Sequence, residues 1–546
     1  MKTFITSALL VAAATAEPIA WKPQPWKGGP GHPGGYPGHP HWPSSVALSG
    51  TATSSAGTAT SGTSSPSGTT IPAVDSEALQ ASIHAENLLA KSQDLEDIAY
   101  ATVGRNRVMG SLGHNNTVAY LVDTLEALGD YYTVTTQPFV GLYAQGDGTF
   151  TVDGLDQGAE YFSYSPGGNV TAPVIAVSNL GCNASDYPAE LDGNIALISR
   201  GSCTFGLKSS LAGAAGAAGA IVYNNIPGLV GGGTLGEVPE AGPFVVTLGI
   251  AQENGTALLD LLTAGTEVTG VIAVDAALYN VTTHNVIAQT TGGNQNSTLV
   301  IGGHSDSVTA GPGINDDGSG IVGLLEVAEQ LTAYTTTNSV RFCFWSGEEF
   351  GLLGSTYYVS TLSEADIAKI PLYLNFDMIA SPNYVYAIYD GDGSSFNISG
   401  PPGSAEAEAF FEQFYINNGL NYTSTAFDGR SDYGPFLEVG VASGGLFTGA
   451  EDIKTAEEAA SFGGTAEIAY DVNYHQAGDN VTNLALDAFE INTKAIAAAV
   501  AEYATTFASL PAGNATTAGL RKRSAETWKR APKVSRGHAN SNKRSY

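Results

Sequence analysis

The sequence predicts an α/β fold in which helices cover both faces of a sheet, with a separate β-rich segment inserted into the chain. Three observations predict it. Strand-like and helix-like periodicities alternate regularly after Val281. Between about 141 and 275 the texture changes to short Val/Ile strands around a Gly/Ala-rich helix. Acidic and His residues follow the predicted strands at their carboxyl ends, where open α/β sheets bind ligands.

The first residues predict a secretory leader followed by a tail of low complexity. Residues 1–16 combine Lys2, a short apolar run and a small-residue cleavage pattern, which is typical of a signal peptide. Residues 17–75 are rich in Pro, Gly and His and then in Ser and Thr, so they are predicted to be a disordered leader or propeptide.

The ordered elements follow in turn. Apolar spacing is helical between 76 and 127, and residues 133–139 alternate as a strand. Later strands are predicted at 285–291, 299–304, 339–345 and 371–379, with a helix over 318–333 and further helices to about 507. We therefore expect a main domain made of 76–140 and 276–508, an inserted domain at 141–275, and a basic disordered tail at 509–546.

Charge separates the tail from the body of the protein. The formal net charge is -30, yet nine Lys and Arg residues follow position 520 against one acidic residue, Glu526. The acidic body argues against nucleic acid as a partner, because phosphates would be repelled. No stretch is apolar for long enough to predict a membrane helix. We expect a monomer, with both ends removed during maturation.

Cysteines and glycosylation sequons also favour the secretory route. Cys182 and Cys203 are close in sequence and are expected to pair in an oxidising compartment, whereas Cys343, in an apolar run, is expected to be a buried small hydrophobe. Asn-x-Ser/Thr sequons predict N-glycosylation at Asn115, Asn169, Asn183, Asn254, Asn280, Asn296, Asn397, Asn421, Asn480 and Asn514.

The residues that carry chemistry lie at strand ends. His304 ends one predicted strand, Glu348 and Glu349 follow the next, and Asp377 closes a third. Histidines combined with several carboxylates suit zinc, and a carboxylate that bridges two ions lets five side chains hold a pair roughly 3.5 to 4 Å apart. By position alone, either Asp316 or Asp317 serves as that bridge.

Five blocks in this order resemble the co-catalytic zinc aminopeptidases, particularly the secreted and vacuolar fungal leucine aminopeptidase group. The blocks are HSDS at 304, INDDGSG at 314, SGEEFGLLGS at 346, NFDMI at 375 and YHQAGD at 474. The resemblance implies a zinc-peptidase mixed sheet flanked by helices. Residues 194–225, within the insertion, resemble the protease-associated domain of this peptidase group, which carries no catalytic residues.

The same resemblance implies a role for each matched residue. One zinc would take His304 and Asp377, the second would take Glu349 and His475, and Asp316 rather than Asp317 would bridge them. It also implies the roles of three further residues, with Glu348 as the proton acceptor, Asp306 as the partner that orients His304, and Tyr474 as a donor to the developing oxyanion.

Several side chains allow two interpretations. Arg430 suits either a contact with the substrate's main chain or a structural ion pair. Asp479 either supports His475 or caps a turn. The remaining histidines in ordered segments lack acidic neighbours and are expected to be surface or satisfied core residues: His84, His114 and His284.

The resemblance implies a secreted enzyme, with the vacuole as an alternative location, that removes N-terminal residues from peptides and favours leucine-type side chains. A free substrate amino group would be held by carboxylates and one metal. The competing hypotheses are a zinc carboxypeptidase of the same fold, disfavoured by the scarcity of Lys and Arg in the body, and a binding protein that has lost catalysis, disfavoured because all five ligands and Glu348 are present.

Overall fold

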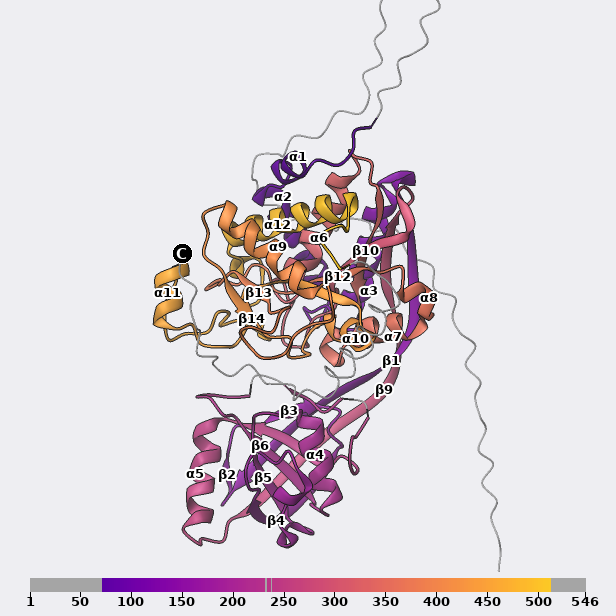
Figure 1. The fold of residues 1–546 in the computed structure, drawn as a ribbon. Helices are drawn as coiled ribbons and strands as arrows, with labels where there is room; N and C mark the ends of the chain where they lie inside the picture. The colour runs from indigo at the N-terminus through magenta and orange to yellow at the C-terminus, as the bar shows by residue number, and fades with distance from the viewer. Residues whose placement is uncertain (1–70, 231–232, 237, 512–546) are drawn as a thin grey trace, which may run out of the picture. The chain divides into compact units, whose positions relative to one another are not determined.

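A computed structural model of the protein describes residues 71–230, 233–236 and 238–511. The main domain, which is the upper part of the ribbon in Figure 1, is built on a mixed sheet whose strands lie in the order β14-β13-β15-β12-β10-β11-β9. Their bounds are β9 Thr269–Thr290, β10 Asn294–His304, β11 Asn338–Trp345, β12 Leu372–Phe376, β13 Ala387–Tyr389, β14 Thr423–Thr425 and β15 Ala442–Phe447.

The centre of this sheet is parallel. Strand β10 pairs in parallel with β11 on one side and with β12 on the other, and β12 continues in parallel to β15. Strands β9 and β13 flank this group in antiparallel orientation, paired with β11 and β15 respectively. The carboxyl ends of three neighbouring strands therefore meet at one edge, as the sequence predicts, and the mixed α/β architecture is confirmed.

Helices pack on both faces because alternate residues of the central strands point in opposite directions. Ile301 lies in an apolar cluster with residues of α6 and α12, whereas the adjacent Val300 lies in a second cluster with residues of α7 and α10. The helices of this domain are α1 Ser76–Ala81, α2 Ala85–Tyr100, α3 Leu112–Glu126, α6 Gly318–Leu331, α7 Leu353–Thr361, α8 Glu364–Ile367, α9 Ser404–Asn417, α10 Tyr433–Glu438, α11 Ala456–Phe462 and α12 Leu486–Thr505.

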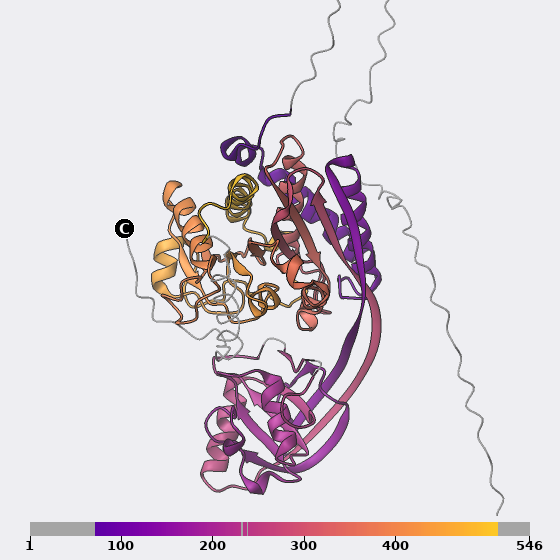
Figure 2. The ribbon, with the colours of Figure 1, turned by 45° about the vertical axis from the view of Figure 1, so that its right-hand side comes forward.

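The inserted domain is entered and left through one long antiparallel ribbon. Strand β1 (Tyr132–Val152) pairs with β9 along its whole length, from Tyr132 opposite Thr290 to Val152 opposite Gly270, and Figure 2 shows the two strands running side by side. The predicted boundaries at 140/141 and 275/276 fall inside these two strands. The inserted elements are β2 Leu155–Asp156, β3 Glu160–Ser163, β4 Gly168–Ala176, β5 Ile195–Ser199, α4 Phe205–Ala214, β6 Gly219–Tyr223, β7 Gly233–Thr234, β8 Val246–Ile250 and α5 Gln252–Thr263.

Within the insertion, the Gly/Ala-rich helix begins and ends earlier than its composition suggests. Helix α4 starts after Thr204, whose hydroxyl accepts from the Leu207 N–H, and it ends at Ala214 because Gly216 adopts a φ of +82°. Nearby, Cys182 and Cys203 are joined in a disulfide, and Cys343 is buried, as expected.

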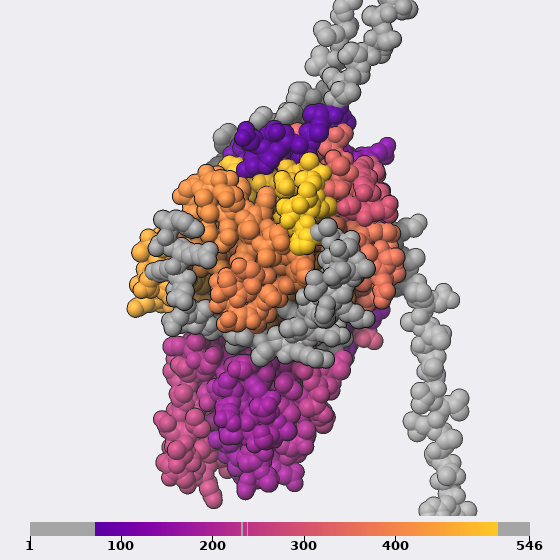
Figure 3. All heavy atoms as spheres, in the orientation of Figure 1, coloured from indigo at the N-terminus to yellow at the C-terminus, as the bar shows by residue number. Residues whose placement is uncertain are grey.

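Order begins before residue 76, where the predicted leader should still be disordered. The Val74 N–H donates to the Thr335 carbonyl, Asp75 caps α1, and Ala73 forms a parallel bridge with Thr335. Helix α1 in turn packs on α12, and Figure 3 shows indigo atoms of the first helices against the yellow atoms of α12. Backbone pairing, rather than composition, decides this boundary.

Across the described ranges, no helix is long and apolar enough to cross a membrane. The predicted signal peptide and most of the leader and basic tail, including Asn514, lie outside the described residues. The other nine sequon asparagines are exposed or half-buried, and their glycosylation stays a prediction.

Candidate metal centre

The five predicted metal ligands come from five separate places in the chain and meet at one edge of the sheet. His304 is the last residue of β10, Glu349 lies in the 3-10 turn η4 (Glu348–Phe350) after β11, and Asp377 directly follows β12. Asp316 lies in the loop before α6, and His475 lies in a loop after α11. All five are buried or nearly so, which places charged and ligating groups in a setting where they need partners.

The carboxylate of Asp316 lies between the two imidazoles. Its Oδ1 is 3.2 Å from His304 Nε2, and its Oδ2 is 3.2 Å from His475 Nε2. His304 Nε2 is also 3.7 Å from Asp377 Oδ1, and His475 Nε2 is 3.1 Å from Glu349 Oε2. The geometry therefore divides the ligands into two sets that share Asp316.

Asp317 is also close to His304 and Asp377, but its oxygens have other partners. Its Oδ2 accepts from the His304 N–H at 3.0 Å, and its Oδ1 accepts from Gly320 at 2.8 Å and Met378 at 3.1 Å. Asp317 thus caps α6 and ties it to β10 and to the turn after β12. These contacts favour Asp316 over Asp317 as the bridging group.

The protein alone leaves this cluster with unbalanced charges. Burial raises the pKa of Glu349. Burial also opposes protonation of His475, but the neighbouring carboxylates of Glu349 and Asp316 outweigh it and raise the His475 pKa well above its ordinary value. The Oε1 atom of Glu349 is buried and has no hydrogen-bond partner among the described residues. An orphaned carboxylate oxygen beside two imidazoles and further carboxylates fits a divalent cation with mixed nitrogen and oxygen ligands.

Glu348 lies beside the ligands, and its backbone is fixed. Its Oε2 is 3.9 Å from His304 Nε2, and burial raises its pKa well above its ordinary value. The turn that presents it depends on Gly347, which has a φ of +76°. Glu348 therefore faces the centre with its carboxylate largely buried.

Asp306 contacts His304 chiefly through its main chain, whereas the prediction assigned this contact to its carboxylate. His304 Nδ1 is 3.2 Å from the Asp306 carbonyl oxygen but 3.7 Å from its Oδ1. That Oδ1 instead accepts from the N–H groups of Gly347 at 2.8 Å and Glu348 at 3.1 Å. Asp306 thus ties the turn after β10 to the turn that carries Glu348.

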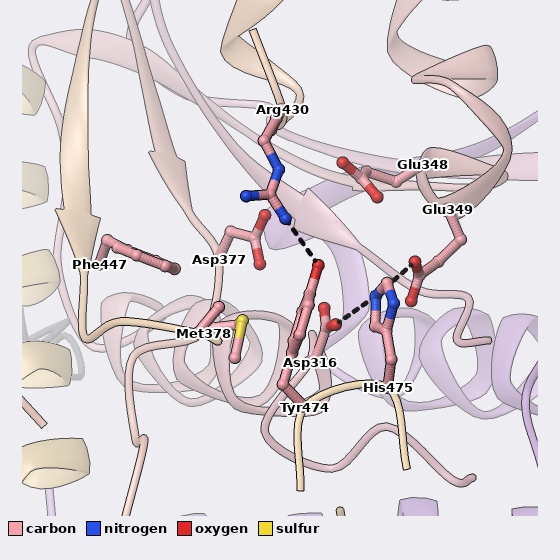
Figure 4. Close-up of a pocket in the computed structure, with 10 residues that line it drawn as sticks. Asp316, Glu348, Glu349, Asp377, Met378, Arg430, Phe447, Tyr474 and His475 are labelled. Atoms are coloured by element: carbon pink, nitrogen blue, oxygen red, sulfur yellow. Dashed lines mark hydrogen bonds and ion pairs between the residues drawn. The ribbon is translucent and has the colours of Figure 1, made fainter. Parts of the chain in front are cut away.

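Of the two roles that the sequence left open for Arg430, the structure shows the structural ion pair. Its Nη1 pairs with Glu451 Oε1 at 2.8 Å, and its Nη2 donates to the Tyr474 hydroxyl at 3.1 Å. The Tyr474 ring stacks on the His475 ring with centroids 3.8 Å apart. Figure 4 shows Arg430 and Tyr474 reaching toward each other across the pocket. Arg430 is thus a structural ion-pair partner that also positions Tyr474.

Asp479 has neither of its two predicted roles. Its carboxylate accepts from the backbone N–H groups of Asn315 at 2.8 Å and Asp316 at 3.0 Å. It therefore positions the bridging residue rather than His475. Of the other histidines, His114 is buried with Nε2 3.0 Å from Ser305 Oγ, His284 is half-buried, and His84 is exposed.

Two residues that support the centre were not predicted from the sequence. The Ser431 hydroxyl donates to Asp377 Oδ2 at 2.5 Å and accepts from Asn375 Nδ2 at 2.7 Å. The fully buried Arg107 donates from Nε to the Pro312 carbonyl at 2.7 Å, and its two other nitrogens bind the carbonyls of Ser305 and Gly313. Ser431 directly follows Arg430, so the GRSDYG segment was the available clue, whereas nothing local marks Arg107.

The pocket at the centre has one polar and one apolar side. Figure 4 shows Asp316, Glu349 and His475 grouped together, with Met378 and Phe447 on the other side of Tyr474. The lining residues are Asp316, Glu348, Glu349, Asp377, Met378, Arg430, Phe447, Ala450, Tyr474 and His475. The pocket therefore offers charged groups and an adjoining apolar surface to the same ligand.

Comparison with known proteins finds a family for the main domain and another for the inserted domain. Residues 285–500 match the model of Peptidase family M28, and residues 170–258 match that of the PA domain. The chain is 52% identical over 466 residues to the probable leucine aminopeptidase 2 of Aspergillus fumigatus, covering 85% of this chain and 93% of that protein. It is 47% identical over 441 residues to leucine aminopeptidase 2 of Trichophyton rubrum, covering 81% and 88% respectively.

Solved structures agree with this result. The aminopeptidase from Aneurinibacillus sp. strain AM-1 is 28% identical, with a TM-score of 0.63 over 81% of this chain and 97% of that one. BSAP, a zinc aminopeptidase from Bacillus subtilis, is 25% identical, with a TM-score of 0.57 over 79% of this chain and 99% of that one.

Proposed function

The chain belongs to peptidase family M28 and is a zinc aminopeptidase, and from this premise we propose that it uses two zinc ions to release leucine-type residues from the amino terminus of peptides. His304 and Asp377 would hold one ion, Glu349 and His475 the other, and Asp316 would bridge them. The observation that carries this proposal is the position of Asp316, with one oxygen 3.2 Å from each imidazole. Two-metal sites use this kind of shared carboxylate.

When bound, the zinc ions would polarise the scissile carbonyl and lower the pKa of the attacking water. Glu348 would accept a proton from that water and deliver it to the leaving amine, a role suited to a buried carboxylate whose pKa is raised by burial. The Tyr474 hydroxyl would donate to the oxyanion, and Arg430, 3.1 Å away, would hold that hydroxyl in place.

The apolar side of the pocket supports a leucine-type preference. Met378, Phe447 and Ala450 line the pocket beside the acidic groups. The carboxylates suit the positively charged terminal amine, while the apolar side chains suit an aliphatic residue joined to it. The two relatives named leucine aminopeptidase 2 support the same preference.

Secretion is part of the proposal and rests on separate observations. The signal-like residues 1–16, the sequons and the Cys182–Cys203 disulfide all suit the secretory route. Delivery to the vacuole remains the alternative. Cell fractionation that finds the mature chain in the medium would support secretion, and its retention in the vacuolar fraction would contradict it.

The catalytic proposal predicts that Glu348→Gln keeps two zinc ions per chain but loses activity. We expect kcat to fall by roughly 10² to 10⁴, because a positioned acid-base group contributes about that factor. Zinc content would be measured by elemental analysis, and hydrolysis with free and N-acetylated aminoacyl nitroanilides that carry Leu, Ala, Glu or Lys.

The matched control is Glu364→Gln, a surface glutamate at the start of α8, which should retain wild-type rates. One zinc ion per fully active chain would contradict the two-ion mechanism. Equal hydrolysis of Leu and Glu substrates would contradict the proposed preference, and cleavage of the acetylated substrates would contradict the requirement for a free amine.

A further inference from the structure

A second acidic cluster lies outside the zinc centre. It is formed by the loop that follows β13 and by the second turn of α9. One carboxylate oxygen from each of Asp390, Asp392 and Glu408 lies within 4.8 Å of the others. None of these residues belongs to the predicted zinc site, and the group contains no His or Cys. The cluster is therefore made only of hard oxygen donors.

The charge on Asp390 is buried and only half satisfied. Its residue surface is 0% exposed, and its Oδ2 accepts from the N–H groups of Ser395 at 3.1 Å and Phe396 at 2.7 Å. Its Oδ1 is buried without a hydrogen-bond partner in the part of the chain that the structure describes. Asp390 therefore brings a buried oxygen without a donor to a group of neighbouring carboxylates.

Glu408 is the second buried carboxylate of this cluster. Glu408 is 5% exposed, and one of its oxygens accepts from the Asp392 N–H at 3.0 Å. Burial raises the pKa of Glu408 to about 8 and also raises the pKa of Asp390, to which the Asp392 carboxylate contributes. Carboxylates this close must share protons or a cation, because bare charges are costly to bury together.

We propose that Asp390, Asp392 and Glu408 bind a calcium ion. Calcium takes oxygen ligands at about 2.4 Å, and the three carboxylate oxygens lie close enough together for one such ion to reach them all. Asp390, Asp392 and Ser394 also alternate along the chain, as do ligands in calcium-binding loops, and a distant Glu completes the set. Magnesium suits the site less well, because it requires shorter bonds and usually retains several waters.

Bound calcium would fasten the loop after β13 to α9. Asp390 and Asp392 belong to the loop, whereas Glu408 belongs to the helix, so one ion would join two elements that are now linked by the bond from the Asp392 N–H. The expected consequence is stabilisation of the folded chain in proportion to calcium occupancy. We expect an affinity in the range of about 10⁻⁵ to 10⁻³ M.

The test uses the full chain in buffer that keeps the zinc site saturated. Thermal unfolding is followed while calcium chloride is added, with magnesium chloride as the comparison. Terbium emission excited through tyrosine gives a second readout, because Tyr389 adjoins Asp390. We expect saturating calcium to raise Tm by about 2 °C or more and to compete with terbium.

Variants separate this site from adventitious binding. Asp392→Asn removes one charge at an exposed position and keeps the oxygen that accepts from Ser394 at 2.7 Å, so its fold should survive. Asp156→Asn is the matched control, because Asp156 is also exposed and its Oδ1 accepts from Gly158 at 3.0 Å. Glu408→Gln provides a second test from the helix side.

We expect Asp156→Asn to respond to calcium as the wild type does, and Asp392→Asn and Glu408→Gln to lose at least half of the Tm shift and of the terbium emission. An unchanged Tm without terbium emission in the wild type would overturn the proposal and leave shared protons as the explanation. An equal response in all four proteins would also overturn it. Zinc-dependent hydrolysis in the same samples reports the catalytic proposal separately.

Discussion

Asp377 Oδ2 lies 2.5 Å from the Ser431 hydroxyl, and this contact fixes which of its oxygens points toward His304. Ser431 is itself held by the side-chain amide of Asn375, two residues before Asp377. A ligand that is oriented in advance loses less conformational freedom when it binds a metal. Neighbours of this kind typically contribute 10- to 100-fold, in round terms about 1.4 to 2.7 kcal/mol, to metal affinity.

Replacing Ser431 should therefore weaken zinc binding. We expect Ser431→Ala to lower zinc affinity about 10- to 100-fold while kcat at saturating zinc stays close to that of the wild type. Activity would be titrated against buffered free zinc. Ser443→Ala is the control, because Ser443 is equally buried but its hydroxyl donates to the carbonyl of Val441, the residue before β15. Identical zinc titrations for wild type and Ser431→Ala would contradict this role.

At the scale of elements, the buried guanidinium of Arg107 holds the loop between β10 and α6. Arg107 lies between α2 and α3, and its side chain donates to the carbonyls of Ser305, Pro312 and Gly313. The loop between β10 and α6 thus folds around a guanidinium whose planar fork matches its carbonyls. This arrangement holds both sides of the segment that leads from His304 to Asp316.

Arg107→Met should destabilise the protein by at least about 2 kcal/mol, because it leaves the buried carbonyls of Ser305 and Pro312 without donors at roughly 1 to 3 kcal/mol each. The Gly313 carbonyl keeps the Gly318 N–H as a donor. Denaturant unfolding followed by fluorescence at saturating zinc would measure the loss. Arg105→Met is a matched control two residues away, where an exposed guanidinium lies 3.8 Å over the Tyr100 ring. It should cost no more than about 1 kcal/mol. Equal stability of the two variants would refute the account of Arg107.

The same elements show what the sequence could predict. The positions of His304, Glu348 and Asp377 at one sheet edge could be predicted from periodicity, because each lies at or just after the end of an apolar run. The contacts that support them could not be predicted, because the partners are remote in sequence. Arg107 and Pro312 are 205 positions apart, and Asp479 and Asp316 are 163 positions apart. Position alone left the choice between Asp316 and Asp317 open, and the family resemblance favoured Asp316. The fold supports that choice, because backbone N–H groups occupy the Asp317 carboxylate.

At the scale of the whole molecule, the inserted domain makes a polar contact close to the pocket. Arg200, which follows β5, has its Nη2 3.5 Å from Glu451 Oε1, the same oxygen that pairs with Arg430. Arg430 in turn holds the Tyr474 hydroxyl. A residue of the insertion is therefore three contacts away from the proposed oxyanion donor.

Removing this contact should affect catalysis modestly and in a salt-dependent way. We expect Arg200→Met to lower kcat/KM for leucyl substrates by about 2- to 5-fold, because a partly exposed ion pair contributes at most about 1 kcal/mol. The difference should shrink at high salt. Lys369→Met is the control, since Lys369 forms a comparable pair with Asp366 on the surface. Unchanged kcat/KM in Arg200→Met at low salt would show that the insertion does not act through Glu451.

The inserted domain lies at the end of the long antiparallel ribbon that β1 and β9 form. Because Val152 faces Gly270, the chain departs and returns at one point, and everything between them acts as one large loop on a closed stem. Closing a loop becomes only slightly more costly as it lengthens, by about 0.6 kcal/mol for each doubling. The pairing register of β1 and β9, and the sheet to which β9 belongs, therefore depend little on the length or content of the inserted domain. Such an architecture lets evolution lengthen, trim or exchange the insertion while the metal-binding edge keeps its geometry.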